Sequence, residues 1–210
     1  MDLQAALRRA RIVPVITIND ADAATGLAEA LRDGGLPVLE VTLRTEAGLS
    51  AIMRIARDLE GVVVGAGTVR TAQQYREARE AGAQFIVSPG CTPDLLSASR
   101  QHGGLFLPGA VTASEVMTLA DAGLSLLKFF PAESSGGAGA VKSFSGPFPD
   151  ISFCPTGGID LARAREYLAL NNVVCVGGTW MVPQQLVDGR GWAQIRELAA
   201  AAVSELRTEP

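Results

Sequence analysis

Eight short apolar runs, rich in Val, Ile and Leu, recur along this chain at nearly even spacing. They begin near Ile12, Val38, Val62, Phe85, Leu105, Leu126, Ile151 and Val173, so that successive runs start 20 to 26 residues apart. That interval holds one strand, one helix and the turns between them. The pattern therefore predicts eight strand–helix units, with parallel strands joined by crossover helices.

The segments between the runs carry helix boundaries. Thr71 and Thr112 precede a Gln or Glu by three residues, as in capping boxes, and Pro93 follows Thr92 at the start of another helix. Glycines at 34–35, 82 and 123 mark helix ends. A short amphipathic segment over residues 2–10 predicts one more helix before the first strand.

Two architectures satisfy this alternation: a closed (β/α)8 TIM barrel and an open, doubly wound sheet. The barrel is favoured because eight even repeats close naturally and the first strand–helix junction lacks the G-x-G-x-x-G fingerprint of a dinucleotide fold. No linker or shift in composition marks a second domain. We expect a single α/β domain over residues 1–210, a (β/α)8 barrel with a short N-terminal helix.

Composition excludes several classes of function. The net charge of −4 and scattered Arg residues offer no basic surface for nucleic acid. One His (His102) and three distant Cys (Cys91, Cys154, Cys175) do not form a metal-binding motif, so no metal is expected. The cysteines are typical of buried thiols in a reducing compartment, and no apolar run approaches the length of a membrane span. We expect a cytoplasmic protein that binds neither membrane nor nucleic acid.

Polar side chains stand on two of the predicted strands. Glu40, Thr42 and Arg44 alternate with apolar residues and so share one face of their strand. Lys128 lies in the run LLKFF, flanked by apolar residues on its own face. Its amine needs a partner there or must lose its proton. One interpretation is a buried Lys128–Glu40 ion pair with a purely structural role.

Chemistry offers the interpretation that we prefer. A desolvated lysine amine becomes a nucleophile that attacks a ketone and forms a Schiff base. A neighbouring carboxylate such as Glu40 would then move protons during dehydration and carbon–carbon cleavage. The other lysine, Lys142, lies in a predicted surface helix and is expected to be solvated.

Glycine-containing turns follow the last two strands. Glycine lets backbone amides approach an anion, and barrels often bind phosphate after these strands. Gly157, Gly158, Gly178 and Thr179 are therefore a candidate phosphate cradle, although tight turns alone also require glycine.

Arg44 and Thr68 are candidates for holding a carboxylate, through a forked donor and a hydroxyl. A surface charge at Arg44 and a turn at Thr68 are the alternatives.

Seven segments in this order resemble one known family: VPVITI, LEVTLRT, VGAGTV, VSPG, LKFFPAE, FCPTGGI and VGGTWMVP. The chain resembles the 2-keto-3-deoxy-6-phosphogluconate aldolases, a family also active on 4-hydroxy-2-oxoglutarate. The resemblance implies a class I aldolase on a barrel, independent of metals and cofactors, assembled as a homotrimer.

The resemblance also implies residue roles. The Schiff-base lysine falls on Lys128, the general acid/base on Glu40 and the carboxylate-binding arginine on Arg44. Further substrate contacts fall on Thr68, Pro89 and Phe130, and phosphate contacts on Gly157, Gly158 and Thr179.

The expected reaction is cleavage of 2-dehydro-3-deoxy-6-phospho-D-gluconate to pyruvate and D-glyceraldehyde 3-phosphate, with 4-hydroxy-2-oxoglutarate as a second substrate. An aldolase for the epimeric 6-phosphogalactonate is the closest alternative, although Thr156 before the glycine pair looks more like the gluconate enzymes. A phosphate-binding isomerase or epimerase would use Lys128 only to polarise its substrate. A regulatory sugar-phosphate-binding barrel would leave the Lys128 and Glu40 pair unexplained.

Overall fold

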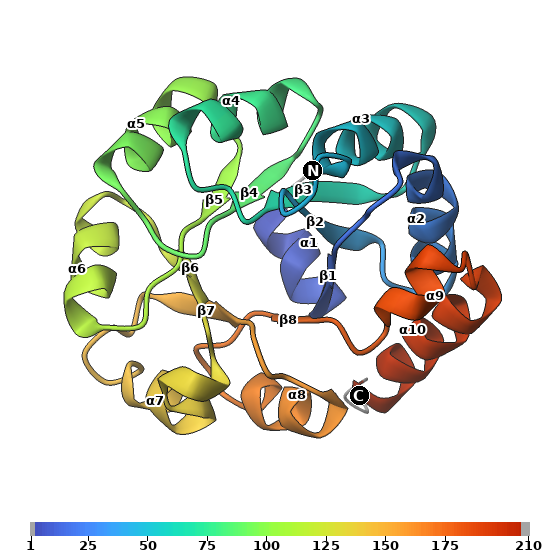
Figure 1. Ribbon diagram of the computed structural model, residues 1–210. Coiled ribbons are helices and arrows are strands. Elements are labelled where there is room, and N and C mark those ends of the chain that lie inside the picture. Colours follow the sequence, from blue (N-terminus) through green and yellow to red (C-terminus); the bar gives the residue numbers. More distant parts are fainter. Residues whose placement is uncertain (1–2, 207–210) are drawn as a thin grey trace.

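The computed structural model describes residues 3–206, and strands alternate with helices along this range (Figure 1). The strands are β1 (Ile12–Ile16), β2 (Val38–Thr42), β3 (Val63–Gly67), β4 (Phe85–Val87), β5 (Leu105–Leu107), β6 (Leu126–Phe129), β7 (Ser152–Pro155) and β8 (Val176–Gly178). The helices are α1 (Leu3–Ala10), α2 (Ala24–Asp33), α3 (Gly48–Asp58), α4 (Ala72–Glu80), α5 (Pro93–His102), α6 (Ala113–Asp121), α7 (Gly137–Ser143), α8 (Leu161–Leu168), α9 (Gln184–Asp188) and α10 (Trp192–Leu206), with short 3-10 turns η1 (Ala21–Ala23) and η2 (Glu133–Ser135). The predicted domain limits, 1 and 210, and the predicted helix start at residue 2 lie outside the described residues.

The sheet closes on itself. Six parallel strands pair in the order β5-β4-β3-β2-β1-β8, and β6 pairs with β7. Two isolated parallel bridges complete the ring. Gly109, just after β5, pairs with Lys128 on β6, and Thr156, just after β7, pairs with Gly177 on β8. The fold is therefore a (β/α)8 barrel, and the open doubly wound sheet is excluded. Figure 1 looks along the barrel, with the helices other than α1 arranged outside the strands.

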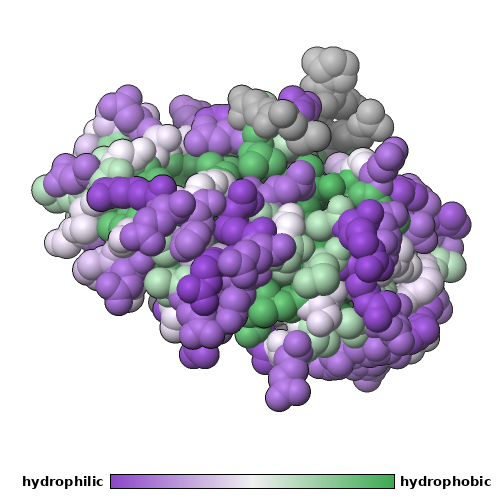
Figure 2. Space-filling model, turned by 90° about the horizontal axis from the view of Figure 1, so that it is seen from above, coloured by the Kyte–Doolittle hydropathy of each residue, from purple (hydrophilic) through white to green (hydrophobic). Residues whose placement is uncertain are grey.

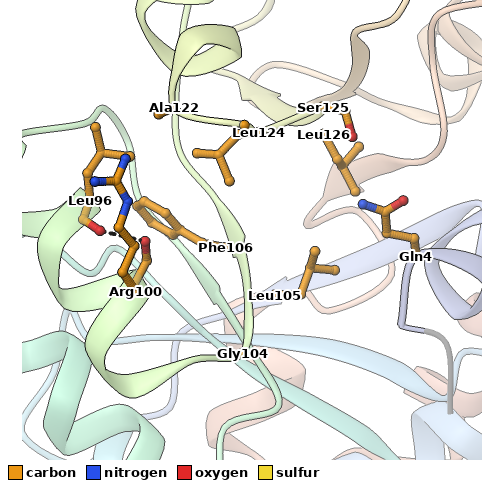
Figure 3. Close-up of a pocket in the computed structure, with 12 residues that line it drawn as sticks. Gln4, Leu96, Arg100, Gly104, Leu105, Phe106, Ala122, Leu124, Ser125 and Leu126 are labelled. Carbon is orange, nitrogen blue, oxygen red and sulfur yellow. Dashed lines mark hydrogen bonds between the residues drawn. The ribbon is translucent and has the colours of Figure 1, made fainter.

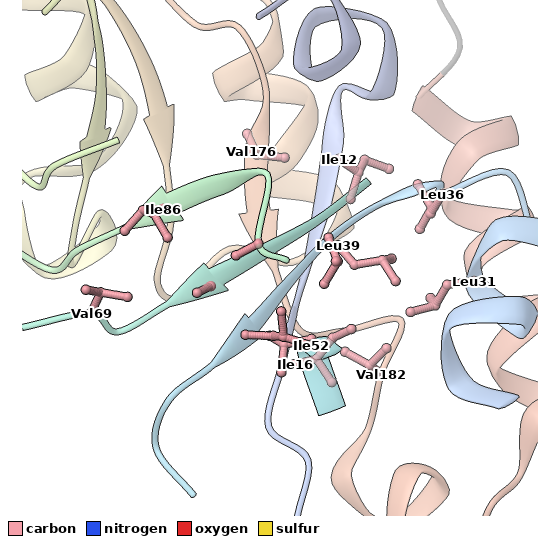
Figure 4. Packing of buried hydrophobic residues seen from close by; sticks show 14 of the residues in the cluster. Ile12, Ile16, Leu31, Leu36, Leu39, Ile52, Val69, Ile86, Val176 and Val182 are labelled. Atoms are coloured by element: carbon pink, nitrogen blue, oxygen red, sulfur yellow. The ribbon is translucent and has the colours of Figure 1, made fainter. Parts of the chain in front are cut away.

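Alternation along the strands creates two apolar layers. One set of side chains, including Ile16 and Leu39, points outward and packs under the helices, where it joins helix residues such as Ile52 of α3 (Figure 4). The other set fills the barrel and includes Val38, Phe85, Leu126 and Cys154, together with Ala6 and Leu7 of α1. Since α1 packs against this inner layer, the amino-terminal helix plugs one end of the barrel, across which it lies in Figure 1.

Two local details differ from the sequence-based expectation. β8 begins at Val176 rather than near Val173, because the pairing of β7 with the segment before β8 changes register. Phe153 bridges Val173, whereas Thr156 bridges Gly177. The three residues that lead from Phe153 to Thr156 therefore lie opposite the four that lead from Val173 to Gly177, and the extra residue forms a bulge before β8.

The second difference concerns a helix cap. The Thr71 hydroxyl accepts from the Gln74 N–H as predicted, but the Gln74 side chain accepts from the Arg70 N–H, so the box is only half formed. The capping box at Thr112 is complete, and Thr92 caps α5 with Pro93 in the first turn, as predicted.

Turned by 90° from the first view, the molecule shows a mainly hydrophilic surface with smaller apolar areas between the polar side chains (Figure 2). Across residues 3–206, no helix has both the length and the apolar character needed to cross a bilayer.

Candidate active site

Lys128 and Glu40 meet inside the barrel. Glu40 lies on β2, two residues beyond the inward-facing Val38, and Lys128 on β6, two residues beyond the inward-facing Leu126. The Lys128 Nζ atom lies 3.1 Å from Glu40 Oε1 and 3.4 Å from Oε2. Only 5% of Lys128 and 3% of Glu40 is exposed, so the ion pair is almost completely shielded from solvent.

A glycine makes room for this carboxylate. Gly67, at the end of β3, pairs with Thr42 on β2, and a Cβ atom there would lie 2.2 Å from Glu40 Oε1. Only a residue without a side chain leaves Glu40 its observed position. Gly67 was not among the predicted site residues, although it lies directly before the predicted Thr68.

Arg44 and Thr68 lie side by side just beyond two neighbouring strands. Arg44 follows the end of β2 and is exposed, and its Nε donates to Thr68 Oγ1 at 3.3 Å. Thr68 adopts a left-handed backbone with φ of +58°. A non-glycine residue in that region costs free energy, which is a feature common at functional sites. The structure thus brings together the two residues predicted to hold a carboxylate.

Phe130 and Pro89 border the same end of the barrel. Phe130 follows β6, and the Lys128 Nζ atom lies 5.4 Å from the centre of its ring. Pro89 follows β4, and a Cβ atom on Gly109 would lie 2.1 Å from the Pro89 carbonyl oxygen. Both residues are half-buried at the carboxyl ends of strands, where barrel enzymes place their sites.

The turn at Gly157 and Gly158, called here the diglycine turn, follows β7. Its φ values of +105° and +76° require glycine. Thr156, directly before it, is buried, and its Oγ1 has no hydrogen-bond partner among the described residues. Thr156 Oγ1 would lie 2.4 Å from a Cβ atom on Gly177, so the diglycine turn and the end of β8 are neighbours. Exposed amides of a left-handed turn favour an anion.

Gly178 ends β8 and Thr179 follows it, beside this turn. A Cβ atom on Gly178 would lie 1.8 Å from the Trp180 ring, so Gly178 is required for the packing of Trp180. Thr179 is exposed.

Lys142, His102 and the cysteines have no predicted role in the reaction. Lys142 is exposed on α7, and His102 is the last residue of α5. Cys175 is fully buried beside Cys154, and the hydrogen bond between the two thiols, together with burial, raises the pKa of Cys175 well above its ordinary value. Within residues 3–206, no three His, Cys, Asp or Glu side chains are placed to hold a metal ion.

The cavity shown in Figure 3 lies elsewhere. It measures about 310 Å³ and is bordered by Gln4 of α1, by Leu105 and Leu126 at the starts of β5 and β6, and by Arg100 of α5. These are the amino ends of the strands, opposite the predicted substrate residues.

A cluster of polar side chains that was not predicted from the sequence lies between η2 and α8, next to the diglycine turn. The Glu133 carboxylate accepts from the Tyr167 hydroxyl at 2.6 Å and pairs with Arg163 Nε at 2.9 Å. Glu133 is the last residue of the LKFFPAE segment, so the motif that carries Lys128 already contained the signal.

Comparisons with known proteins show which family this chain resembles over most of its length. A family model described as KDPG and KHG aldolase matches residues 3–198. The 2-dehydro-3-deoxy-phosphogluconate aldolase of Pseudoalteromonas atlantica is 50% identical over 193 residues, which cover 92% of this chain and 90% of that protein. The KHG/KDPG aldolase of Escherichia coli K12 is 47% identical over 192 residues, covering 91% and 90%.

A solved structure is similar over nearly the whole chain. The KDPG aldolase of Legionella pneumophila, with pyruvate captured as a covalent carbinolamine intermediate, superposes with a TM-score of 0.93 at 41% identity. The superposition covers 96% of this chain and 98% of that one.

Proposed function

This chain belongs to the KDPG and KHG aldolase family, and we propose that it cleaves 2-dehydro-3-deoxy-6-phospho-D-gluconate to pyruvate and D-glyceraldehyde 3-phosphate. It is a carbon–carbon lyase. The observation that carries the proposal is the buried 3.1 Å contact between Lys128 Nζ and Glu40 Oε1. The pair supplies a nucleophile and a proton carrier in one desolvated place.

The contact solves the first problem of Schiff-base chemistry, which is that a protonated amine cannot attack. Transfer of one proton from Lys128 Nζ to Glu40 leaves a neutral amine beside a neutral carboxylic acid. The amine attacks the C2 ketone of the substrate and forms a carbinolamine. Glu40 returns its proton to the departing hydroxyl, water leaves, and an iminium remains.

Cleavage of the C3–C4 bond uses the same two residues. The Glu40 carboxylate accepts the proton of the C4 hydroxyl, and the bond electrons flow into the iminium to give an enamine. The new C4 carbonyl belongs to glyceraldehyde 3-phosphate, which departs. Protonation of the enamine at C3 and hydrolysis of the resulting imine release pyruvate and regenerate the amine.

The surrounding residues supply two anion sites. Arg44 with Thr68 suits the carboxylate next to the ketone, and the diglycine turn with Gly178 and Thr179 suits the phosphate. Phe130 and Pro89 border the carbon chain between them. Thr156, whose hydroxyl has no hydrogen-bond partner within residues 3–206, suits a substrate hydroxyl.

A second substrate, 4-hydroxy-2-oxoglutarate, follows from the same chemistry, because it carries the ketone, the adjacent carboxylate and the C4 hydroxyl. Its cleavage yields pyruvate and glyoxylate. The name of the E. coli relative supports this activity.

Borohydride trapping tests the assignment of the lysine. With pyruvate present, reduction should add one reduced pyruvyl group to the peptide that contains Lys128. Lys128→Met should lose the label, whereas Lys142→Met keeps it. Label on Lys142, or none at all, would overturn the proposal.

Pyruvate release tests the substrate. We expect turnover of the gluconate epimer in excess of the galactonate epimer, and a reversed preference would favour the 6-phosphogalactonate aldolase. Full activity in Lys128→Arg would instead support an isomerase or epimerase, and tight sugar-phosphate binding without turnover would support a regulatory barrel.

We also propose that the chain acts as one catalytic domain in a cytoplasmic homotrimer. The three free cysteines support a reducing compartment. The trimer rests on the resemblance to the family, and sedimentation equilibrium tests it: a mass other than three chains would contradict it. Cell fractionation tests the location, and recovery with the membranes or the periplasm would contradict it.

A further inference from the structure

Glu133 has a role that the reaction does not account for. It stands in η2, five residues after Lys128, and its half-buried carboxylate reaches α8 on the far side of the diglycine turn. One oxygen accepts from the Tyr167 hydroxyl at 2.6 Å, and the other pairs with Arg163 Nε at 2.9 Å. Both carboxylate oxygens are therefore fixed by side chains of a single helix.

The same residue contacts the diglycine turn directly. The Glu133 N–H donates to the Gly157 carbonyl at 3.2 Å, and a Cβ atom on Gly158 would lie 2.8 Å from Glu133 Cγ. The backbone of Glu133 thus holds one side of the turn, while its side chain packs against the other. Movement of Glu133 would move the turn.

The far end of the contact is also anchored. Asp160, two residues after Gly158, caps α8 by accepting from the Arg163 N–H at 2.9 Å, and its other oxygen pairs with Arg163 Nη1 at 2.8 Å. Arg163 therefore joins Glu133 to the residue at which the turn enters the helix.

Tyr167 completes the anchor as a permanent donor. Its side chain is fully buried. Burial raises the pKa of Tyr167, and the hydrogen-bonded Glu133 carboxylate raises it further, so the phenol stays protonated.

We propose that Glu133, held by Tyr167 and Arg163, is a positioning residue that fixes the diglycine turn in the shape that binds the substrate phosphate. The proposal rests on the function proposed above and assigns no contact between Glu133 and the reacting atoms. Arg163 has a second task, because an unpaired carboxylate behind a phosphate site would repel the ligand. Arg163 offsets the charge of Glu133 while it also pairs with Asp160, so removing Arg163 would leave two carboxylates unpaired next to the turn.

The test compares a phosphate-dependent and a phosphate-independent measurement. Arg163→Gln should raise KM for the phosphorylated substrate about tenfold, and Tyr167→Phe about threefold. The rate of borohydride trapping with pyruvate, which has no phosphate, should stay within twofold of the unmodified chain. Arg163→Lys should recover part of the loss, because it restores the positive charge.

Arg165→Gln is the matched control. Arg165 lies on the same helix and also forms an ion pair, but with Glu205 on α10, away from the turn. We expect its KM and trapping rate to be unchanged.

Two results would overturn the positioning role: an unchanged KM in both Arg163→Gln and Tyr167→Phe, or a parallel fall in trapping rate that indicates general loosening of the fold. Failure of the proposed function is distinguishable from either, because the unmodified chain itself would then show no trapped pyruvate.

Discussion

Adding one methyl group at Gly67 should disable the proposed acid/base while leaving the lysine intact. In Gly67→Ala the new Cβ atom would start 2.2 Å from Glu40 Oε1, whereas real Cβ atoms essentially never approach closer than 3.0 Å. The carboxylate must therefore move by about 0.8 Å, the difference between these two distances. Its 3.1 Å contact with Lys128 Nζ is lost or distorted.

The magnitude follows from the sensitivity of proton transfer to position. A misplacement of about 1 Å costs on the order of 100-fold in rate, so kcat should fall by roughly that factor, or ~2.7 kcal/mol. Overpacking of the barrel interior should also lower the free energy of unfolding by ~1–3 kcal/mol.

The assay is pyruvate release under saturating substrate, with borohydride trapping and urea unfolding of the same variant. We expect Lys128 still to be trapped by borohydride on long incubation, because its amine is present, but more slowly, because Glu40 also carries the protons for Schiff-base formation. Gly139→Ala is the control, since nothing lies within 4 Å of a Cβ atom at that exposed helix position. A folded Gly67→Ala protein with kcat within about threefold of the unmodified chain would refute the reasoning.

Three further predictions concern buried charge, pH and thiol reactivity. Glu40→Gln should lower the free energy of unfolding by ~3 kcal/mol, because it leaves the Lys128 amine buried without its charged partner. The inactive double variant Glu40→Leu, Lys128→Met removes both charges and should be at least as stable as the unmodified chain. Urea titrations that find the double variant less stable than Glu40→Gln would contradict this. Glu115→Gln should cost ~0.5 kcal/mol at pH 7. Hydrogen bonds from the Val111 N–H and from Thr112, the N-cap, hold the pKa of Glu115 below its ordinary value of 4.5. The stabilisation by the Glu115 carboxylate is therefore complete above pH 4.5 and should disappear as the pH falls through the lowered pKa. A stability difference between Glu115→Gln and the unmodified chain that persists at pH 2 would be contrary evidence. Partial burial raises the pKa of Cys91 to about 11, so at pH 8 only about one thiol in a thousand is ionised. Iodoacetamide should therefore label Cys91 far more slowly in the native chain than in urea. Equal labelling rates in both would contradict the raised pKa.

The architecture was predictable from the sequence because its signals are local and repeated. Eight apolar runs at even spacing imply parallel strands, and residues such as Thr92, Thr112 and Gly123 mark helix ends by their own chemistry. The start of β8 was misplaced by three residues. The extra residue before β8 depends on how Phe153 and Thr156 pair with Val173 and Gly177, which no local sequence pattern predicts.

The candidate site was predictable in its residue types and less so in its supports. Lys128 was conspicuous because an apolar strand with one lysine is unusual, and Glu40 because its strand carries polar residues on one face. Gly67 and Glu133 were missed, since a glycine in a strand and a glutamate in a loop are ordinary until their neighbours are known. Their importance comes from a 2.2 Å clearance and from two side chains on α8.

The sequence by itself determined which side chains share a face of their strand, because alternation groups Glu40 with Thr42 and Arg44, and Lys128 with its apolar neighbours, regardless of what lies opposite. It also determined that one lysine would be buried and the other exposed. Only the tertiary structure decided that the two inner side chains, 88 residues apart, meet at 3.1 Å, and that Glu133 is held between α8 and the diglycine turn. Those contacts depend on barrel closure and strand register, which arise from packing across the whole sheet and cannot be read from any single segment.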